Sequence, residues 1–188
     1  MLLLIDNYDS FSHILADLIR RTGEELLILR NDVSLDELDQ IDFKGLILSP
    51  GPGRPENAGN LMAIFEKYYT EVPVLGVCLG HQAIGEFFGA KLVKSQIPIH
   101  GKVFPVKKSK PHFLTDSLPD HFNVTRYHSL QLEDLPENLE VILETENGEI
   151  MAMAHTELPI LGIQYHPEAH LTEYGLDLVK NWVLKSIR

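Results

Sequence analysis

Residues 72–89 read VPVLGVCLGHQAIGEFFG, an apolar run followed by a cysteine and then by a mixed run that closes on glycine. Val72 to Val77 predicts a short buried strand, and Gly80 to Phe88 predicts a helix that ends at the following glycine. Cys78 stands between the two, with a glycine two residues before it and another two residues after it. A nucleophile elbow has this layout, because the turn from strand to helix is too sharp for bulky neighbours.

Such an elbow aims the sulfur of Cys78, the single cysteine of the chain, at the start of a helix. The helix dipole at that end favours the thiolate, which is the reactive form of cysteine. The alternative is a buried core thiol, which is the usual fate of a lone cysteine. We favour the nucleophile, because two distant segments of the sequence supply the partners that a reactive thiol needs.

The first partner segment is GIQYHPE at residues 162–168. The apolar run Ile160 to Tyr165 predicts a strand that ends at His166, and Glu168 follows across a proline. A thiol nucleophile needs an imidazole to take its proton, and the imidazole needs a carboxylate to fix its tautomer. Because the proline restrains its own φ and its neighbour, one rigid turn carries both groups. Taken alone, this segment is equally compatible with a surface turn that has an incidental histidine and glutamate.

The second partner segment is LSPGPG at residues 48–53, after the apolar strand expected at Gly45 to Leu48. Its two prolines cannot donate hydrogen bonds, so the free backbone amides include those of Gly51 and Gly53. Amides at the carboxyl end of a strand can form an oxyanion hole. A phosphate-binding loop would need a following Lys-Ser or Lys-Thr pair, which this segment lacks. A plain proline-glycine loop is the remaining alternative.

The composition limits the class of protein. A length of 188 residues predicts one domain, residues 1–188, with a substantial core. The net charge of −11 argues against a nucleic-acid partner, which needs a basic face. A single cysteine forbids an internal disulfide and predicts a reducing, cytoplasmic location. The apolar run Met1 to Ile5 is too short for a membrane span and has no basic segment before it, so we expect a strand.

The first half of the chain alternates between apolar runs and helical patterns. The expected strands are Leu2–Ile5, Leu26–Leu29, Gly45–Leu48 and Val72–Val77. The expected helices between them are about Phe11–Ile19, Ser34–Asp39 and Leu61–Tyr68. For the first helix we expect Asp9 or Ser10 as N-cap and Gly23 as the stop. Because the strands are apolar throughout, the alternation predicts an α/β fold: a doubly wound, mostly parallel sheet with helices on both faces.

After Lys91 the pattern changes to short runs typical of a smaller antiparallel strand region. These runs are Lys91–Val93, Lys102–Val106, Asn123–Arg126, Val141–Thr145 and Ile150–His155. The strand at Ile160–Tyr165 follows, and a final helix is expected at Glu173–Ser186. Ligands of doubly wound sheets bind beyond the carboxyl ends of the strands. Since Gly51, Cys78 and His166 each follow a strand, we expect them to share one cleft.

Of the nine histidines, only His166 has a carboxylate placed beside it by a rigid turn. His81 lies one helical turn beyond the cysteine, and we expect it to pack on or cap its helix. His128 is expected to shape a loop. No metal site is predicted, because the single cysteine is committed to chemistry and the cluster of His166, Glu168 and His170 is a weak one.

Six segments of the sequence together resemble a known family. They are Leu4–Phe11, Ser49–Gly53, Gly76–Gln82, His100–Lys102, Arg126–Leu130 and Gln164–Glu168. In this order they resemble the class I, or triad, glutamine amidotransferases over essentially the whole chain. Within that family the resemblance is to the small subunit of anthranilate synthase and of aminodeoxychorismate synthase. Two features depart from the family pattern: Ala169 replaces a frequent serine, and residues 11–14 differ from the commoner Phe-Thr-Tyr-Asn.

The resemblance implies that glutamine is the substrate and that Cys78, His166 and Glu168 form a catalytic triad. The thiolate would attack the side-chain amide, and hydrolysis of the resulting thioester would release glutamate. The backbone amide of Leu79 would stabilise the oxyanion together with that of Gly51, whose role is carried over from the resemblance.

The resemblance also implies that Gln82, Ser129 and Leu130 hold the substrate glutamine, the last two through backbone groups. Nothing in the sequence recognises chorismate or a nucleotide, so the chain would make ammonia only, and no cofactor is implied. A separate chorismate-binding synthase subunit would use the ammonia. That partner would be component I of anthranilate synthase or of aminodeoxychorismate synthase.

Two other functions stay open at this point. A stand-alone γ-glutamyl hydrolase would share the elbow, although the signature at Asp6–Phe11 favours the synthase subunit. A catalytically silent regulatory subunit would have no need of an intact cysteine, histidine and glutamate. The sequence does not separate the anthranilate branch from the aminodeoxychorismate branch.

Overall fold

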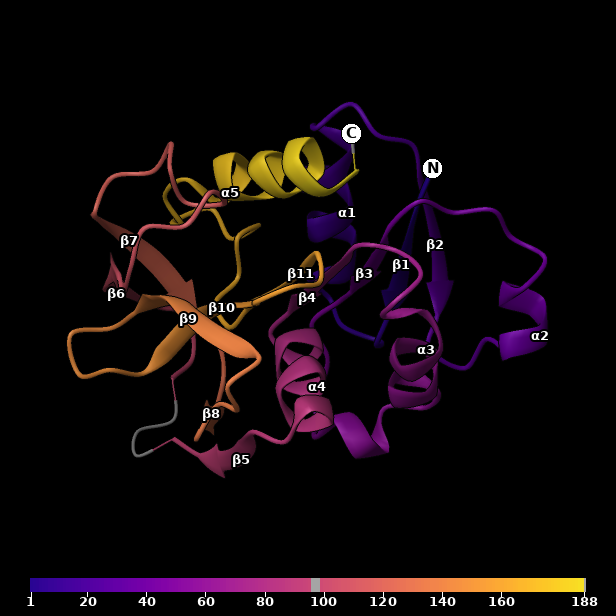
Figure 1. Ribbon diagram of the computed structural model, residues 1–188, viewed down its shortest axis with the longest axis horizontal. Helices are drawn as coiled ribbons and strands as arrows, with labels where there is room; N and C mark the ends of the chain where they lie inside the picture. The colour runs from indigo at the N-terminus through magenta and orange to yellow at the C-terminus, as the bar shows by residue number, and fades with distance from the viewer. Residues whose placement is uncertain (96–98, 188) are drawn as a thin grey trace.

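A nine-stranded sheet runs through the computed structural model, which describes residues 1–95 and 99–187 (Figure 1). The strands lie in the order β2-β1-β3-β4-β11-β10-β9-β6-β7. Their bounds are β1 Leu2–Asp6, β2 Leu26–Arg30, β3 Leu46–Leu48, β4 Val74–Val77, β6 Lys102–Lys108, β7 His121–Arg126, β9 Leu139–Glu144, β10 Ile150–His155 and β11 Ile160–Ile163. A separate antiparallel pair consists of β5 Lys91–Lys94 and β8 Leu130–Glu133.

The first five strands of that order, β2 to β11, are parallel. The other four continue the same sheet with antiparallel pairing. The predicted α/β fold is therefore confirmed. The antiparallel strands mostly extend the main sheet, and only β5 and β8 stand apart from it. Strand β8 was not among the predicted strands, because the run Leu130–Glu133 is short and its partner strand lies far earlier in the chain.

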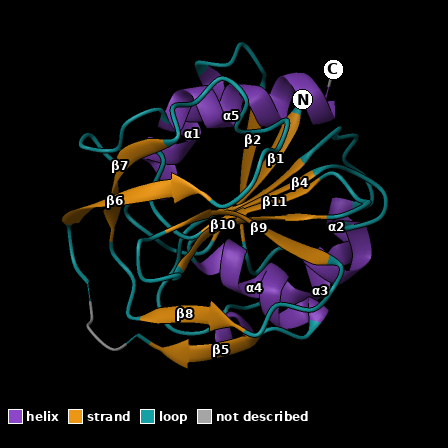
Figure 2. Ribbon diagram, turned by 60° about the vertical axis from the view of Figure 1, so that its left-hand side comes forward, coloured by secondary structure: helices purple, strands orange, loops and turns teal. Residues whose placement is uncertain are grey.

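Helices cover both faces of the parallel part of the sheet, as predicted (Figure 2). On one face lie α1 and α5, and on the other lie α3 and α4. The helices are α1 Ser12–Arg20, α2 Leu35–Leu38, α3 Leu61–Tyr68, α4 Leu79–Phe88 and α5 Gly175–Trp182, with a 3₁₀ turn at Pro55–Asn57 and a π-helical turn at Val183–Ile187. Strand β1 explains the two layers: Leu2 and Leu4 join the core under α1 and α5, while Leu3 and Ile5 join the core under α3 and α4.

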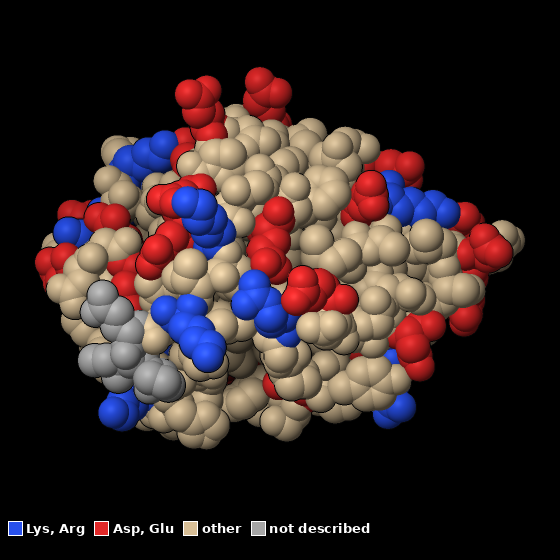
Figure 3. Space-filling view, turned by 90° about the horizontal axis from the view of Figure 1, so that it is seen from below, with Lys and Arg blue, Asp and Glu red and all other residues tan. Residues whose placement is uncertain are grey.

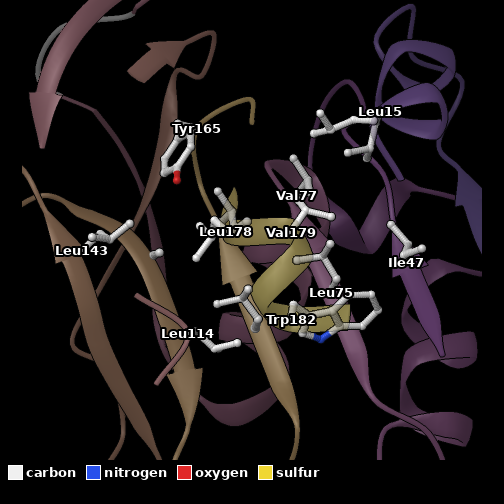
Figure 4. Close-up of a cluster of buried hydrophobic side chains, with 14 of the residues drawn as sticks. Leu15, Ile47, Leu75, Val77, Leu114, Leu143, Tyr165, Leu178, Val179 and Trp182 are labelled. Carbon is white, nitrogen blue, oxygen red and sulfur yellow. The ribbon is translucent and has the colours of Figure 1, made fainter. Parts of the chain in front are cut away.

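The core under α5 is shown in Figure 4. Leu178, Val179 and Trp182 of α5 are fully buried over Leu75 and Val77 of β4. These contacts fix the strand that leads directly to the cysteine. The position of the elbow is thus set by side chains from the far end of the chain.

Two helix boundaries differ from the predictions. The first helix begins at Ser12, and its N-cap, Phe11, makes no side-chain cap. The expected cap, Asp9, accepts a hydrogen bond from the amide of Phe11 instead, at 2.8 Å, and so stabilises the turn before the helix. The final helix begins only at Gly175, because its N-cap Tyr174 has a left-handed backbone with φ +56°. Glycine is required at this start, since a Cβ there would lie 2.0 Å from the carbonyl oxygen of Pro167.

The surface carries charges of both signs. On the face that Figure 3 shows, acidic and basic side chains are interspersed, without a continuous basic area. Within the described ranges, no helix is both long and apolar enough to cross a membrane.

The first turn of α4 approaches β3 at backbone distance. A Cβ added at Gly80 would lie 2.3 Å from the carbonyl oxygen of Leu48, which the sheet holds in place. We expect Gly80→Ala to lower the free energy of unfolding by about 1–3 kcal/mol, the usual cost of overpacking. Urea unfolding followed by circular dichroism measures this loss.

Gly85→Ala is the matched control in the same helix. Its Cβ would meet only the side chain of Leu132, which can change rotamer, and alanine is the better helix former by about 1 kcal/mol. We therefore expect a smaller loss than for Gly80→Ala. Equal losses would show that the contact with Leu48 does not limit the approach of the helix.

Candidate active site

The sharp turn predicted at Cys78 is present between β4 and α4. The residue has φ +53° and ψ −99°, a strained conformation for a side chain other than glycine. Its amide donates to the carbonyl of Ile163 at 2.8 Å, which ties the turn to β11. A Cβ at Gly76 would lie 2.5 Å from the backbone of Gly80, so the two glycines flanking the cysteine are sterically required. Strain held in this way is typical of functional sites.

The three segments singled out in the sequence meet at one edge of the sheet. Strands β3, β4 and β11 are parallel neighbours, so their carboxyl ends lie side by side. Gly51 follows the first of these strands, Cys78 the second and His166 the third. The three residues therefore share one edge of the sheet, and the expected common cleft stays a prediction.

His166 and Glu168 form a buried pair. The ring Nδ1 lies 2.7 Å from Oε1 of the carboxylate, and the two side chains are 3% and 0% exposed. The backbone of His166 is fixed on both sides, since its amide donates to Thr125 at 3.1 Å and its carbonyl accepts from the Thr172 hydroxyl at 2.8 Å. The second carboxylate oxygen of Glu168 has no hydrogen-bond partner in the described part of the chain. The imidazole of His166 is therefore the main partner of this carboxylate.

Two aromatic rings confine the imidazole. The ring centroid of Phe11 lies 4.8 Å from that of His166, and the centroid of Tyr127 lies 5.0 Å from it. The two aromatic rings also contact each other at 4.8 Å. Both residues belong to segments that carried the family resemblance, but the sequence assigned them no role. Their contacts join loops that are distant in sequence, and only the fold reveals them.

The electrostatics favour a charged imidazole beside the sulfur. Burial alone lowers the pKa of His166, but the sulfur of Cys78 and the carboxylate of Glu168 together raise this pKa well above its ordinary value. A histidine that stays protonated next to a thiol stabilises the thiolate. The site is thus suited to hold a thiolate–imidazolium pair.

The other two candidate histidines have different environments. His81 is fully buried against Gly162 of β11, and burial lowers its pKa to about 3. A group with so low a pKa is a poor base, and its packing agrees with the prediction. His128 also has its pKa lowered, to about 4, by burial and by the neighbouring Arg126. Its ring bonds the carbonyl of Leu130 at 2.8 Å and shapes that loop, as expected.

The residues proposed for the oxyanion hole are only partly brought together. Gly51 lies against Leu79, because a Cβ on the glycine would be 2.5 Å from the leucine side chain. No group in the described ranges accepts a hydrogen bond from either amide. Asn7 stabilises this loop through two hydrogen bonds to Ser49, each 2.9 Å long. Its backbone amide donates to the Ser49 hydroxyl, and its side-chain nitrogen donates to the Ser49 carbonyl. Gly53 has φ +77° on the exposed part of the loop, with open space around it, and its role as a donor stays a prediction.

Two of the residues predicted to hold the substrate, Gln82 and Leu130, are in direct contact. The side-chain nitrogen of Gln82 donates to the carbonyl of Leu130 at 3.3 Å. Ser129 is exposed, and its carbonyl accepts from the amide of Ser95 at 2.9 Å. Gln164 was not among the predicted site residues, yet its side-chain nitrogen lies 3.8 Å from the sulfur of Cys78. Its place two residues before the histidine was the available signal.

Comparison with known proteins agrees with this geometry. Residues 3–186 match the family Glutamine amidotransferase class-I. Anthranilate synthase component 2 of Azospirillum brasilense is 46% identical over 187 residues, which cover 97% of this chain and 95% of that protein. Aminodeoxychorismate/anthranilate synthase component 2 of Bacillus subtilis is 38% identical over 186 residues, again 97% of this chain and 95% of that protein.

A solved structure agrees as well. A protein of Thermoplasma acidophilum, provisionally assigned as part of a GMP synthase, has a TM-score of 0.85 at 28% identity, with 97% of this chain and 91% of that chain covered. The family match over nearly all residues, the two relatives and this structure point the same way. The chain belongs to the class I glutamine amidotransferases.

Proposed function

We propose that this chain is the glutaminase subunit of a chorismate-using synthase and that Cys78, His166 and Glu168 are its catalytic triad. The observation that carries the proposal is the buried His166–Glu168 pair, 2.7 Å apart, beside a cysteine in a strained elbow. The relatives named as component 2 of anthranilate and aminodeoxychorismate synthases support the choice of partner, which is a component I subunit.

In the first half of the reaction, the thiolate of Cys78 attacks the side-chain carbonyl carbon of glutamine, and a carbon–sulfur bond forms. The amides of Leu79 and Gly51 stabilise the resulting oxyanion. The carbon–nitrogen bond then breaks while the imidazolium of His166 gives its proton to the leaving nitrogen, so that ammonia departs. Glu168 holds the tautomer and orientation of the ring throughout.

In the second half, the neutral imidazole of His166 takes a proton from water, and the hydroxide attacks the glutamyl thioester. Collapse of this intermediate breaks the carbon–sulfur bond, releases glutamate and restores the thiolate beside the imidazolium. In this scheme Gln82, Ser129 and Leu130 hold the substrate glutamine. Since the ammonia would protonate in bulk water, the proposal includes direct delivery to the synthase subunit.

The proposal takes residues 1–188 as one glutamine amidotransferase domain that works in the cytoplasm. The names of the relatives favour the synthase subunit over a stand-alone γ-glutamyl hydrolase. The buried His166–Glu168 pair argues against a catalytically silent subunit, which would have no use for it. Because the relatives carry both synthase names, the proposal covers the anthranilate and the aminodeoxychorismate branch alike.

The first prediction concerns the nucleophile. Cys78→Ser is expected to abolish glutamine-dependent synthesis by the complex, because the hydroxyl has no accessible charged form. Ammonia-dependent synthesis should persist, since that reaction takes place on the other subunit. Both rates are measured on the same purified complex. A Cys78→Ser complex that uses glutamine at nearly the wild-type rate would exclude this residue as the nucleophile.

The second prediction separates two histidines. His166→Ala should lower the rate of glutamine hydrolysis by about 10⁴-fold or more, as loss of a triad base does. His81→Ala leaves a cavity in the core, so it should mainly lower the melting temperature. Steady-state kinetics and thermal melts of the two variants test this ranking. If His81→Ala had the larger effect on the rate, the base would be His81.

The third prediction concerns control by the partner. The loop after β1 bonds Ser49, which leads to Gly51, and the same loop exposes 51% of Tyr8. A docked subunit that moves this loop would move an oxyanion donor, and one such donor is worth roughly 10²–10³ in rate. We expect glutamate release by the isolated chain to rise substantially when the synthase subunit is added at saturating glutamine. Equal rates would favour the stand-alone hydrolase.

A further inference from the structure

A continuous series of buried and partly buried hydrogen bonds leads from a carboxylate to the sulfur of Cys78. Its first links are Arg126 Nη1 to Glu149 Oε2 at 2.7 Å, Arg126 Nε to His128 Nε2 at 3.1 Å and His128 Nδ1 to the Leu130 carbonyl at 2.8 Å. Its last links are Gln82 Nε2 to the same carbonyl at 3.3 Å, Gln82 Nε2 to Gln164 Oε1 at 3.2 Å and Gln164 Nε2 to Cys78 Sγ at 3.8 Å. The side chains that link the two ends of this series are almost completely buried, namely those of Arg126, His128, Gln82 and Gln164.

The carbonyl of Leu130 fixes the direction of every link, because a carbonyl can only accept. His128 must therefore carry its proton on Nδ1, which leaves Nε2 free to accept from Arg126, a group that can only donate. From Gln82 the same carbonyl can accept a hydrogen bond only through the NH₂ group, so that group must face it. That NH₂ group also meets Gln164, so Gln164 must present its oxygen to Gln82 and its nitrogen to the sulfur.

The opposite orientation of Gln164 is excluded on the same grounds. A flipped side chain would place NH₂ against the NH₂ of Gln82 and a carbonyl oxygen against the sulfur. The first contact would be repulsive, and so would the second when the sulfur is a thiolate; the residue is fully buried, so no solvent would compensate. The sulfur of Cys78 therefore faces an N–H donor whose direction is set by a backbone carbonyl at the start of β8.

We propose that Gln164 stabilises the thiolate of Cys78 through its side-chain N–H, and that Gln82 and the Leu130 carbonyl hold Gln164 in the orientation this requires. The inference rests on the proposed role of Cys78 as nucleophile. An N–H donor favours the charged form of the sulfur over the neutral one, and a buried donor does so more strongly than one in water. Gln164 touches the reacting sulfur, whereas Gln82 acts through Gln164 as a positioning residue.

Other titratable and charged groups surround the sulfur. His166 interacts with it directly, and Glu168 acts through His166. His128, next to Arg126, acts on His166 electrostatically. His81 lies one turn further along α4 and is neutral. A substitution at Gln164 leaves all of these groups in place, so a change in the titration of the thiol reports the loss of the amide.

The experiment uses the fact that Cys78 is the only cysteine of the chain. The rate of its alkylation by iodoacetamide, measured across pH, follows the thiolate without substrate or partner. Gln164→Met keeps the length of the side chain and removes both polar atoms. We expect the midpoint of the alkylation profile to move to higher pH, with the rate below the midpoint lowered about tenfold, which corresponds to one pKa unit.

Gln131→Met is the matched control. This glutamine neighbours Leu130 in β8 and is also buried, but its side-chain nitrogen bonds Glu133 at 3.0 Å and takes no part in the series that ends at the sulfur. Its alkylation profile should coincide with that of the wild type. An equal shift in both variants would overturn the proposal, because the effect would then come from general loss of packing.

Gln82→Met provides a second test, which also serves if Gln164→Met does not fold. It frees Gln164 to rotate, so the midpoint should move in the same direction by a smaller amount. Unchanged midpoints in the folded variants, with wild-type circular dichroism and melting temperature, would overturn the proposal. Such a failure would leave the proposed function standing, since the loss of glutamine hydrolysis in Cys78→Ser is measured independently.

Discussion

The close approach of Gly76, Gly80 and Leu48 is the constraint on which the site depends. Added Cβ atoms at the two glycines would come within 2.5 Å of neighbouring backbone, so the helix can start immediately after the strand only because these side chains are missing. The tight start forces Cys78 to φ +53° and places its sulfur at the first turn of α4. Packing of α5 on β4 keeps that strand in place and so helps to maintain the strain.

The strained cysteine lies beside a buried pair of groups that can both carry charge. His166 is buried, which would ordinarily neutralise it, but the sulfur on one side and Glu168 on the other favour the imidazolium. A buried carboxylate also needs a partner, and the imidazolium supplies one within 2.7 Å. The imidazole and the carboxylate each therefore supply the partner that the other needs because it is buried. The rings of Phe11 and Tyr127 keep this arrangement rigid by contacting the imidazole.

Much of this arrangement could be predicted from the sequence because its signals are local. Residues 76–80 alone predict the elbow, and His166 and Glu168 are only two residues apart. The alternation of apolar strands and helices predicted the parallel sheet, and with it the shared edge at Gly51, Cys78 and His166. What escaped prediction depends on pairings distant in sequence. Strand β8 is defined by its pairing with the much earlier β5, and the role proposed for Gln164 depends on contact with a cysteine 86 residues away.

Strand β8, which the sequence did not predict, influences the surroundings of Cys78, which the sequence singled out first. The carbonyl of Leu130 opens β8 and accepts from both His128 and Gln82, so it sets the direction of the amides that lead to the sulfur. A backbone carbonyl cannot reverse its polarity, whereas a glutamine or histidine side chain can. The environment of Cys78 is therefore fixed by main-chain geometry at the start of a strand that shares no sequence signal with the elbow. A local motif thus places the cysteine at the elbow, and the tertiary fold decides which atoms face its sulfur.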